Sequence, residues 1–266
     1  MAKATLLLLA AVRAATRRPG GPPACSGLPS GPEKERPPRV DAKERLRWRS
    51  AAWPKSPIPP PLSTQACAAC GDVLGVPVQR LREDDAIGTL DLTGHSIGVL
   101  GARLLAFLLP AASSVCNLCV RCNELGPEGA ATLAEQLRAS PALTSLDLAQ
   151  NYLGVQGGTA LAEGLKGSAV TSLNLAFNGI GAEGVTKLAA VLGQTEIAHL
   201  NLMGSSLCGV NQYGRGTYTC EGITKLCAGL KGSAVTLLNV RENSLEGSAK
   251  VAIRMVFKDL PIELLI

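Results

Sequence analysis

The segment Leu143-Thr-Ser-Leu-Asp-Leu-Ala-Gln-Asn-Tyr-Leu-Gly154 has a pattern that recurs along most of the chain. A near copy is Val170-Thr-Ser-Leu-Asn-Leu-Ala-Phe-Asn-Gly-Ile-Gly181, and further copies begin at Ile87, Val115, Ile197 and Val235. The leucines that anchor the six copies are spaced by 28, 28, 27, 27 and 38 residues: Leu90, Leu118, Leu146, Leu173, Leu200 and Leu238. Such a period indicates a chain built from stacked structural repeats.

Each copy has the same internal order. A Leu-x-Leu core alternates with period 2, which is typical of a short, half-buried strand. An asparagine follows in four copies, and we expect its buried amide to bond the backbone of its own turn and of the next coil: Asn123, Asn151, Asn178 and Asn243. An amphipathic helix then follows, with leucine pairs four residues apart on one face: Leu133 and Leu137, Leu161 and Leu165, Leu188 and Leu192.

The pattern LxxLxLxxN-x-[LI]-G, followed by LAexL in the helix, closely resembles the leucine-rich-repeat family. The resemblance is to the longer strand-helix subtype seen in ribonuclease inhibitor, the Ran GTPase-activating proteins and the sensor tails of NOD-like receptors. It covers residues 87–266 and implies an α/β solenoid, right-handed, with parallel strands on the concave side and helices on the convex side. His95 and Ser205 replace the asparagine in the first and fifth copies, which puts the turn bonding there in doubt.

Charge and proline divide the chain into two parts. Residues 1–62 hold twelve of the 26 Lys and Arg residues, four of the 21 Asp and Glu residues and twelve of the 17 prolines, so their net charge is +8. Residues 63–266 carry a net charge of −3. We therefore expect a disordered, Pro-rich basic leader over 1–62, an N-terminal cap or degenerate repeat over 63–86, and about six repeats over 87–266. Pro261–Ile266 stands where a further strand should begin, either as a cap or because the chain continues.

The compartment stays open at this stage. Residues 1–18 contain arginines and no acid, which favours an organellar transit peptide, although a short secretory signal or an untargeted terminus are alternatives. Nine cysteines, an odd number, indicate a reducing environment. The expected compartment is therefore the cytoplasm, or an organelle if residues 1–18 are a transit peptide. The sequence does not decide whether the leader is cleaved. No run of 18 apolar residues predicts a membrane span.

Strand parity predicts which side chains face the concave surface, where this family commonly holds its partner. The face is small, polar and almost neutral. Its predicted partner-binding residues are Asp91, Arg121, Asp147, His199, Asn201, Met203, Asn239 and Arg241. The same rule assigns Ala149 and Ala176 to this face.

The fifth copy contains an insertion of eleven residues, 208–218, which accounts for the 38-residue spacing. It lies between Leu207 and the next helix, so it should protrude at one rim. Tyr213, Arg215 and Tyr218 make it a second candidate for partner binding, because exposed aromatic and arginine side chains on a loop favour recognition. A tolerated insertion without a role is the alternative.

Metal and catalytic sites are not predicted. Cys67-x-x-Cys70 forms only half of a zinc site, and Cys116 and Cys119 point to opposite faces of a predicted strand. No phosphate-binding loop, nucleophile elbow or HExxH motif occurs. We therefore expect no enzyme, no cofactor and no metal.

The sequence favours a non-enzymatic interaction or scaffolding module, a monomer that binds a protein rather than nucleic acid or membrane. One alternative is a GTPase-activating or regulatory protein of the Ran type, with Arg121 or Arg215 as the residue to test. Another is a sensor or inhibitor module of a larger protein. The repeat pattern specifies a scaffold and not its partner.

Overall fold

A computed structural model describes residues 72–83, 87–211, 214–258 and 260–266. The leader over 1–62, its targeting and proline-rich segments, the pair Cys67 and Cys70, and Tyr213 of the insertion lie outside the described residues. The strands are β1 Thr89–Asp91, β2 Asn117–Cys119, β3 Ser145–Asp147, β4 Ser172–Asn174, β5 His199–Asn201, β6 Leu237–Asn239 and β7 Glu263–Leu265. The helices are α4 Val78–Glu83, α5 Gly98–Leu108, α6 Gly126–Gln136, α7 Gly154–Leu165, α8 Gly181–Val191, α9 Glu221–Leu230 and α10 Gly247–Phe257. Short 3-10 turns extend three helices: Leu109–Ala111, Leu137–Ala139 and Leu192–Gln194.

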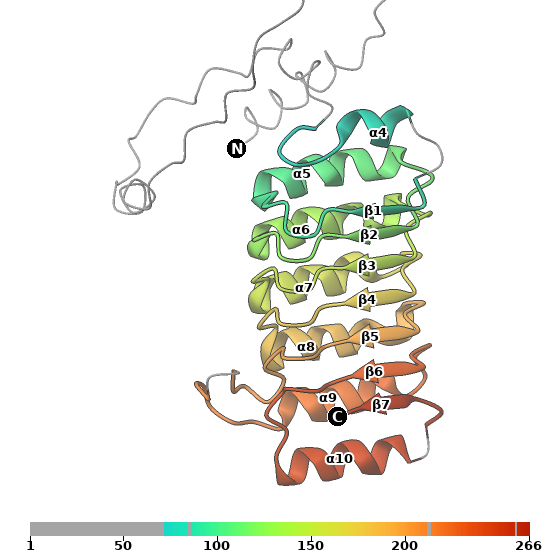
Figure 1. Ribbon diagram of the computed structural model, residues 1–266. Coiled ribbons are helices and arrows are strands. Elements are labelled where there is room, and N and C mark those ends of the chain that lie inside the picture. Colours follow the sequence, from blue (N-terminus) through green and yellow to red (C-terminus); the bar gives the residue numbers. More distant parts are fainter. Residues whose placement is uncertain (1–71, 84–86, 212–213, 259) are drawn as a thin grey trace, which may run out of the picture. The chain divides into compact units, whose positions relative to one another are not determined.

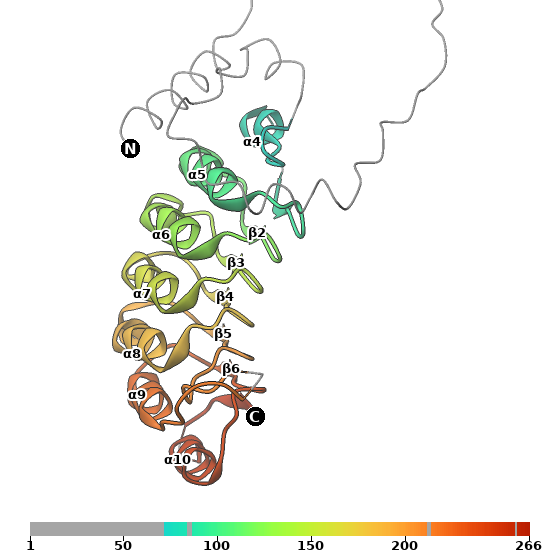
Figure 2. The same ribbon diagram turned by 90° about the vertical axis from the view of Figure 1, so that its left-hand side faces the viewer.

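Strands and helices form two layers, as Figures 1 and 2 show. The described strands form one parallel sheet in the order β1 to β7. The helices from α5 onward stack in the same order and cover one face of this sheet. This α/β solenoid confirms the predicted fold class. The strand expected at Pro261–Ile266 is β7, which pairs in parallel with β6 and gives the sheet one strand more than the six repeat copies.

The anchor leucines define the register of the sheet. Leu118 pairs with Leu146 and Leu146 with Leu173, and the same register continues to Leu200, Leu238 and Leu264. Leu146 and Leu148 are fully buried, as are Leu161 and Leu165 on the facing helix. Each buried leucine contributes about 1.5–3 kcal/mol, and no single repeat can bury its apolar face alone.

The helices begin seven residues before the first leucine of the pair that marks each of them: 133 − 126, 161 − 154 and 188 − 181. α6, α7 and α8 begin at Gly126, Gly154 and Gly181, whose backbone φ values of 62°, 62° and 71° lie in the left-handed region. Glycine adopts that conformation without strain, which allows an abrupt passage from turn to helix. The first helical turn is less apolar, so periodicity alone does not reveal it.

Buried asparagines join neighbouring repeats. The Nδ2 of Asn151 donates to the carbonyl oxygens of Leu148 in its own repeat (2.9 Å) and of Val120 in the preceding repeat (2.8 Å). Asn123, Asn178 and Asn243 make equivalent bonds. The expectation that these side chains reach the next coil was wrong in direction: they reach back to the preceding one, because the carbonyls left unpaired by each turn point toward the following asparagine.

The two departures from asparagine behave differently. Ser205 is fully buried, and its hydroxyl donates to the carbonyl of Leu175 at 3.0 Å, so it replaces one of the bonds of the amide. His95 is exposed, and its Nδ1 lies 3.1 Å from the carbonyl oxygen of Thr93. The fifth repeat therefore keeps a side-chain link to its neighbour, whereas His95 bonds only within its own turn.

Candidate functional site

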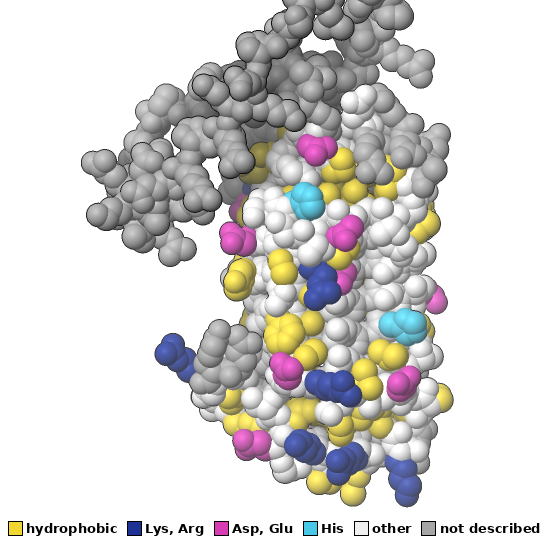
Figure 3. Space-filling view, viewed as in Figure 1, with side chains coloured by type: hydrophobic (Ala, Val, Ile, Leu, Met, Phe, Trp, Pro, Cys, Tyr) yellow, Lys and Arg dark blue, Asp and Glu magenta, His cyan; other side chains and the backbone are white. Residues whose placement is uncertain are grey.

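The strand side carries a row of polar side chains, one from each repeat. Figure 3 shows this side, with acidic groups spread along the stack and several Lys and Arg side chains toward its α10 end. The parity rule holds for the strands themselves, since the residues on either side of each anchor leucine are exposed or half-buried. One position after the strands, it holds for Thr93, Arg121 and Arg241, which are exposed, and is wrong for the small residues Ala149 and Ala176, which are buried.

The acidic and amide residues of this row also hold the turns of their own repeats. An oxygen of Asp91 accepts the backbone N–H of Thr93 at 2.9 Å, and Asp147 does the same for Ala149 at 3.0 Å. Asn174, Asn201 and Asn239 repeat this arrangement with the residue two positions later. Short polar side chains commonly stabilise turns in this way. Asp91, Asp147, Asn201 and Asn239 therefore have a structural role that parity alone does not reveal.

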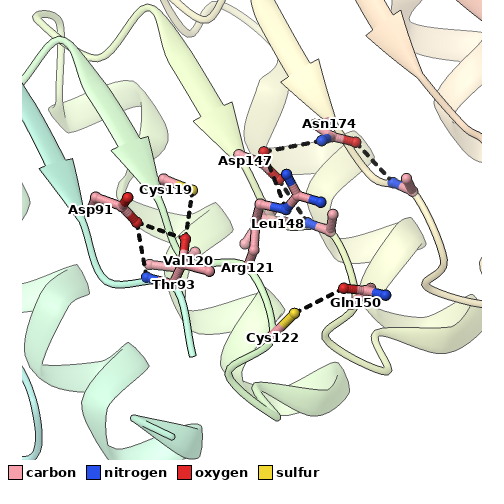
Figure 4. A network of polar contacts seen from close by, with 12 residues as sticks. Asp91, Thr93, Cys119, Val120, Arg121, Cys122, Asp147, Leu148, Gln150 and Asn174 are labelled. Atoms are coloured by element: carbon pink, nitrogen blue, oxygen red, sulfur yellow. Dashed lines mark hydrogen bonds and ion pairs between the residues drawn. The ribbon is translucent and has the colours of Figure 1, made fainter. Parts of the chain in front are cut away.

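A small network of polar contacts crosses the first four strands (Figure 4). The Oδ2 of Asp147 lies 3.8 Å from the Nε of Arg121 and accepts from the Nδ2 of Asn174 at 3.0 Å. The hydroxyl of Thr93 donates to Asp91 at 2.6 Å, and this bond, followed by the backbone N–H of the same residue, lowers the pKa of the Asp91 carboxyl. Most of these polar side chains on β1 to β4 therefore already have hydrogen-bond or ion-pair partners within the protein.

The strand face over β5 and β6 has side chains that are exposed to solvent. His199 and Arg241 are exposed, and Met203 is half-buried beside Asn239. A shallow depression of about 300 Å³ lies over β3 to β6, lined by Ser145, Leu146, Asp147, Ser172, Leu173, Asn174, His199, Leu200, Asn201 and Leu237.

The base of the insertion is less exposed than its composition indicated. Cys208 is fully buried, which raises the pKa of its thiol. Tyr218 is half-buried: its hydroxyl donates to the carbonyl of Glu246 at 3.2 Å and lies 3.3 Å from the N–H of the same residue. Loss of solvent, and then the contact with Cys220, raise the pKa of this tyrosine to about 12. The exposure expected for Tyr218 is therefore wrong in part, because both ends of the insertion pack against the solenoid.

The tip of the insertion does project. Val210 and Gly216 form an isolated antiparallel bridge, and the side-chain oxygen of Asn211 accepts the backbone N–H of Arg215 at 3.0 Å. Gly214–Thr217 are exposed, Arg215 included. Figure 1 shows this segment standing out beside α9.

A hollow that the repeat pattern did not predict lies where the strands turn into the helices. We call it the rim hollow. It measures about 660 Å³ and is lined by Cys122, Glu124, Gln150, Tyr152, Phe177, Asn178, Gly179, Gly204, Ser206 and Asn211. Tyr152 is 74% exposed and Phe177 is half-buried, in a chain with only 3% aromatic residues. The signal available in the sequence was the presence of bulky aromatic residues immediately beside two buried asparagines.

The backbone around the rim hollow is firmly tied. The N–H groups of Gln150, Phe177 and Gly204 each donate to a carbonyl of the next repeat, at 2.9, 2.8 and 3.0 Å. A Cβ atom on Gly204 would lie 2.4 Å from the ring of Phe177, so the ring rests where the glycine has no side chain. The aromatic groups are thus presented by a rigid scaffold.

The cysteines of the second repeat are dispersed. Cys116 and Cys122 are exposed, Cys122 donates to the side-chain oxygen of Gln150 at 2.8 Å, and Cys119 contacts the hydroxyl of Thr93 at 3.1 Å. Within the described ranges, no group of three or more His, Cys, Asp or Glu residues is arranged to hold a metal ion. In the same part of the chain, no helix has the length and apolar character needed to cross a bilayer.

Comparisons with known proteins agree with this architecture. A leucine-rich-repeat family model matches residues 139–162 and 169–189, and this is a repeat family rather than an enzyme family. No curated protein matches the chain.

A solved structure resembles the fold. A leucine-rich-repeat-containing protein from Legionella pneumophila, LegL7, shares 22% identity at a TM-score of 0.50 over 71% of this chain, which spans 59% of that protein's chain. A structure described as the actin-binding site 2 of leiomodin-1 shares 13% identity at a TM-score of 0.41, over 68% of this chain and 86% of the other. The repeats, their register and the solenoid together give this chain a leucine-rich-repeat-like fold, and residues 139–162 and 169–189 match the repeat family itself.

Proposed function

We propose that the protein is a non-enzymatic interaction module that binds a protein partner at the rim hollow, the tip of the 208–218 insertion and the adjoining part of the strand face. The observation that carries this proposal is the position of Tyr152 and Phe177. Both side chains line one hollow of about 660 Å³ that also reaches Asn211 of the insertion. Exposed aromatic residues around a concavity are typical of the energetic centre of a protein interface.

The shape of the hollow favours a partner that inserts a side chain. Gly179 and Gly204 contribute no side-chain atoms, whereas Tyr152 and Phe177 stand beside them. Because the backbone beneath is hydrogen-bonded from repeat to repeat, little ordering is needed when the partner binds. The hollow would thus supply affinity.

The strand face supports specificity rather than most of the affinity. Asp147 is already paired with Arg121 and Asn174, so a partner gains little from it. His199 and Arg241 are exposed and make no ion pair with other described residues, so they are the strand-face groups best placed to accept a polar partner. The depression over β3 to β6 lies beside His199 and Asn201.

The test is affinity capture from native extract with the full chain, comparing wild type with Tyr152→Ala and Phe177→Ala. We expect a partner that wild type captures to be lost, because truncating a central aromatic residue costs about 2 kcal/mol, roughly thirtyfold in Kd. Phe107→Ala is the matched control, since Phe107 is an exposed aromatic residue on α5, in the helix layer. A partner retained by both rim variants would show that the rim hollow is not the binding site.

The GTPase-activating alternative makes a different prediction at the insertion. Arg215 is exposed at its tip and makes no ion pair with the other described residues. Arg121, in contrast, faces Asp147 at 3.8 Å. If the protein stimulated a small GTPase, Arg215→Ala would remove that stimulation while binding persisted, and absence of stimulation by wild type would discard the alternative.

A further inference from the structure

One pair of helix positions has the same environment along the whole stack except at its end. In five successive helices the two residues are buried, and most are small: Ala102 and Ala106, Ala130 and Ala134, Gly158 and Ala162, Val185 and Ala189, Ile223 and Cys227. These positions face the following helix. A Cβ on Gly157 would touch Ala130, one on Gly164 would meet the backbone of Ala134, and one on Gly229 would meet that of Ala189. Small side chains there let adjacent helices approach closely.

At α10 the same two positions hold Lys250 and Arg254. Both are exposed, and Lys258 continues the row one turn later. Val251 and Met255 lie next to them and are 53% and 70% exposed. We call these five residues the α10 end face. Figure 3 shows Lys and Arg side chains gathered with apolar ones at the end of the solenoid where α10 lies.

A terminal repeat needs a polar outer face, but the cations of the α10 end face have no counter-charge in the described fold. None of the three forms an ion pair with another residue that the structure describes. Like charges four residues apart on a helix destabilise it. Arg254 and Lys258 lie near the C-terminal end of the helix, where a cation is favourable, but Lys250 lies in the first turn, where it is not. The acids flanking this helix in the sequence are Glu246, which is exposed, and Asp259, which lies outside the described residues; Glu263 on β7 is also exposed.

We propose that the α10 end face binds an acidic amphipathic helix of a protein partner, seated where a further helix of the stack would pack. Glutamate or aspartate residues of that helix would lie opposite Lys250 and Arg254, and its apolar residues would cover Val251 and Met255. Helix-on-helix packing is how every other helix from α5 onward is covered, and α10 has this side open. The charge of the face selects an acidic helix over an apolar one.

An anionic membrane is the competing occupant, and the geometry disfavours it. Helices that enter a bilayer interface carry a broad apolar face rich in large residues. α10 exposes only Val251 and Met255 beyond half of their surface, and the helix spans eleven residues. This surface lies at the end of the solenoid and involves none of the residues of the rim hollow, so it stands independently of the function proposed above.

The experiment measures binding of the full chain to two synthetic helical peptides by fluorescence anisotropy. One peptide presents glutamates beside leucines, and the other replaces each glutamate by lysine. We expect the acidic peptide to bind wild type, and to bind Lys250→Glu/Arg254→Glu at least about tenfold more weakly, while the basic peptide gains affinity for that variant. The matched control is Lys187→Glu/Lys225→Glu, which makes the same charge change at exposed lysines of α8 and α9.

Three results would overturn the proposal. One is equal binding of the acidic peptide to wild type and to the charge-reversed variant. Another is an equal loss in the Lys187→Glu/Lys225→Glu control, which would indicate only net-charge attraction. The last is binding to phosphatidylserine-containing vesicles that depends on Lys250 and Arg254 when the peptide does not bind. The variant Lys250→Gln/Arg254→Gln, with its melting curve, separates loss of binding from loss of folding.

Discussion

The side-chain oxygen of Asn151 accepts the backbone N–H of Asn123 at 2.9 Å, and the side-chain oxygen of Asn178 accepts that of Asn151 at 2.8 Å. Each asparagine therefore receives a bond from the repeat before it while its own backbone is held by the repeat after it. The result is a buried polar chain through the middle of the stack, and it makes the stability of one repeat depend on its neighbours.

Replacing Asn151 by alanine should destabilise the protein by about 3 kcal/mol or more. The change leaves the carbonyl of Val120 and the N–H groups of Asn123 and Leu125 without partners in a buried region, at about 1–3 kcal/mol each. Urea unfolding measures the loss. His95→Ala is the control, because His95 occupies the same repeat position but is exposed. Similar losses for both variants would contradict the role given to the buried amide.

Replacing Leu146 by aspartate should unfold the central repeats. Leu146 is fully buried in β3, where an unpaired carboxylate cannot be solvated, and changes of this kind cost more than about 4 kcal/mol. Circular dichroism of the variant at 25 °C tests this. Thr144→Asp, two residues earlier at an exposed position, should melt close to wild type. A wild-type melting curve for Leu146→Asp would show that the register is wrong.

Replacing Gly164 by alanine should be destabilising even though alanine is the better helix former. The added Cβ would lie 2.3 Å from the carbonyl oxygen of Ala134 on the preceding helix, so the two helices must separate. Overpacking of this kind costs about 1–3 kcal/mol. Gly193→Ala, where no atom lies within 4 Å, should change the melting temperature little. Stabilisation of the protein by Gly164→Ala would show that the α6–α7 contact is looser than described.

The phenol of Tyr218 should titrate near pH 12, because burial disfavours its charged form. A raised pKa in the folded state means that the neutral phenol is favoured by folding. This stabilisation is fully present below the ordinary value of 10.0 and is lost as pH rises toward 12. Ultraviolet absorbance at the phenolate band, compared between wild type and Tyr218→Phe, isolates the group. A difference spectrum that titrates near pH 10 would show that the phenol of Tyr218 is not buried at the base of the insertion.

Much of the fold follows from local pattern. The period of the anchor leucines predicts the parallel register, and the alternation around Leu146 predicts which side of each strand is buried. The leucine pair Leu161 and Leu165 predicts the face of the helix. These features depend on residues close in sequence, whose period of two or of 3.6 matches the geometry of a strand or a helix.

The rim hollow could not be predicted in this way. Tyr152 and Phe177 are 25 residues apart and share one hollow only because consecutive repeats stack in register. Asp147 shows a second limit of prediction from the sequence. Strand parity correctly places it on the exposed face, but does not reveal that its side-chain oxygen accepts the backbone N–H of Ala149. Side-chain bonds to the backbone depend on the local turn, which a periodic pattern does not describe.

The sequence by itself thus determined a repeating strand and helix, the residues that form the core and the place of the insertion, because each depends on short-range periodicity. Only the tertiary structure decided which side chains meet across repeats. It brought Tyr152 and Phe177 into one hollow and bound Tyr218 to Glu246. It also left Lys250 and Arg254 exposed at positions that are buried in every earlier helix from α5 onward. The physical reason is that stacking brings together residues a full repeat apart in the sequence. The type of either residue alone does not indicate which residue it will contact.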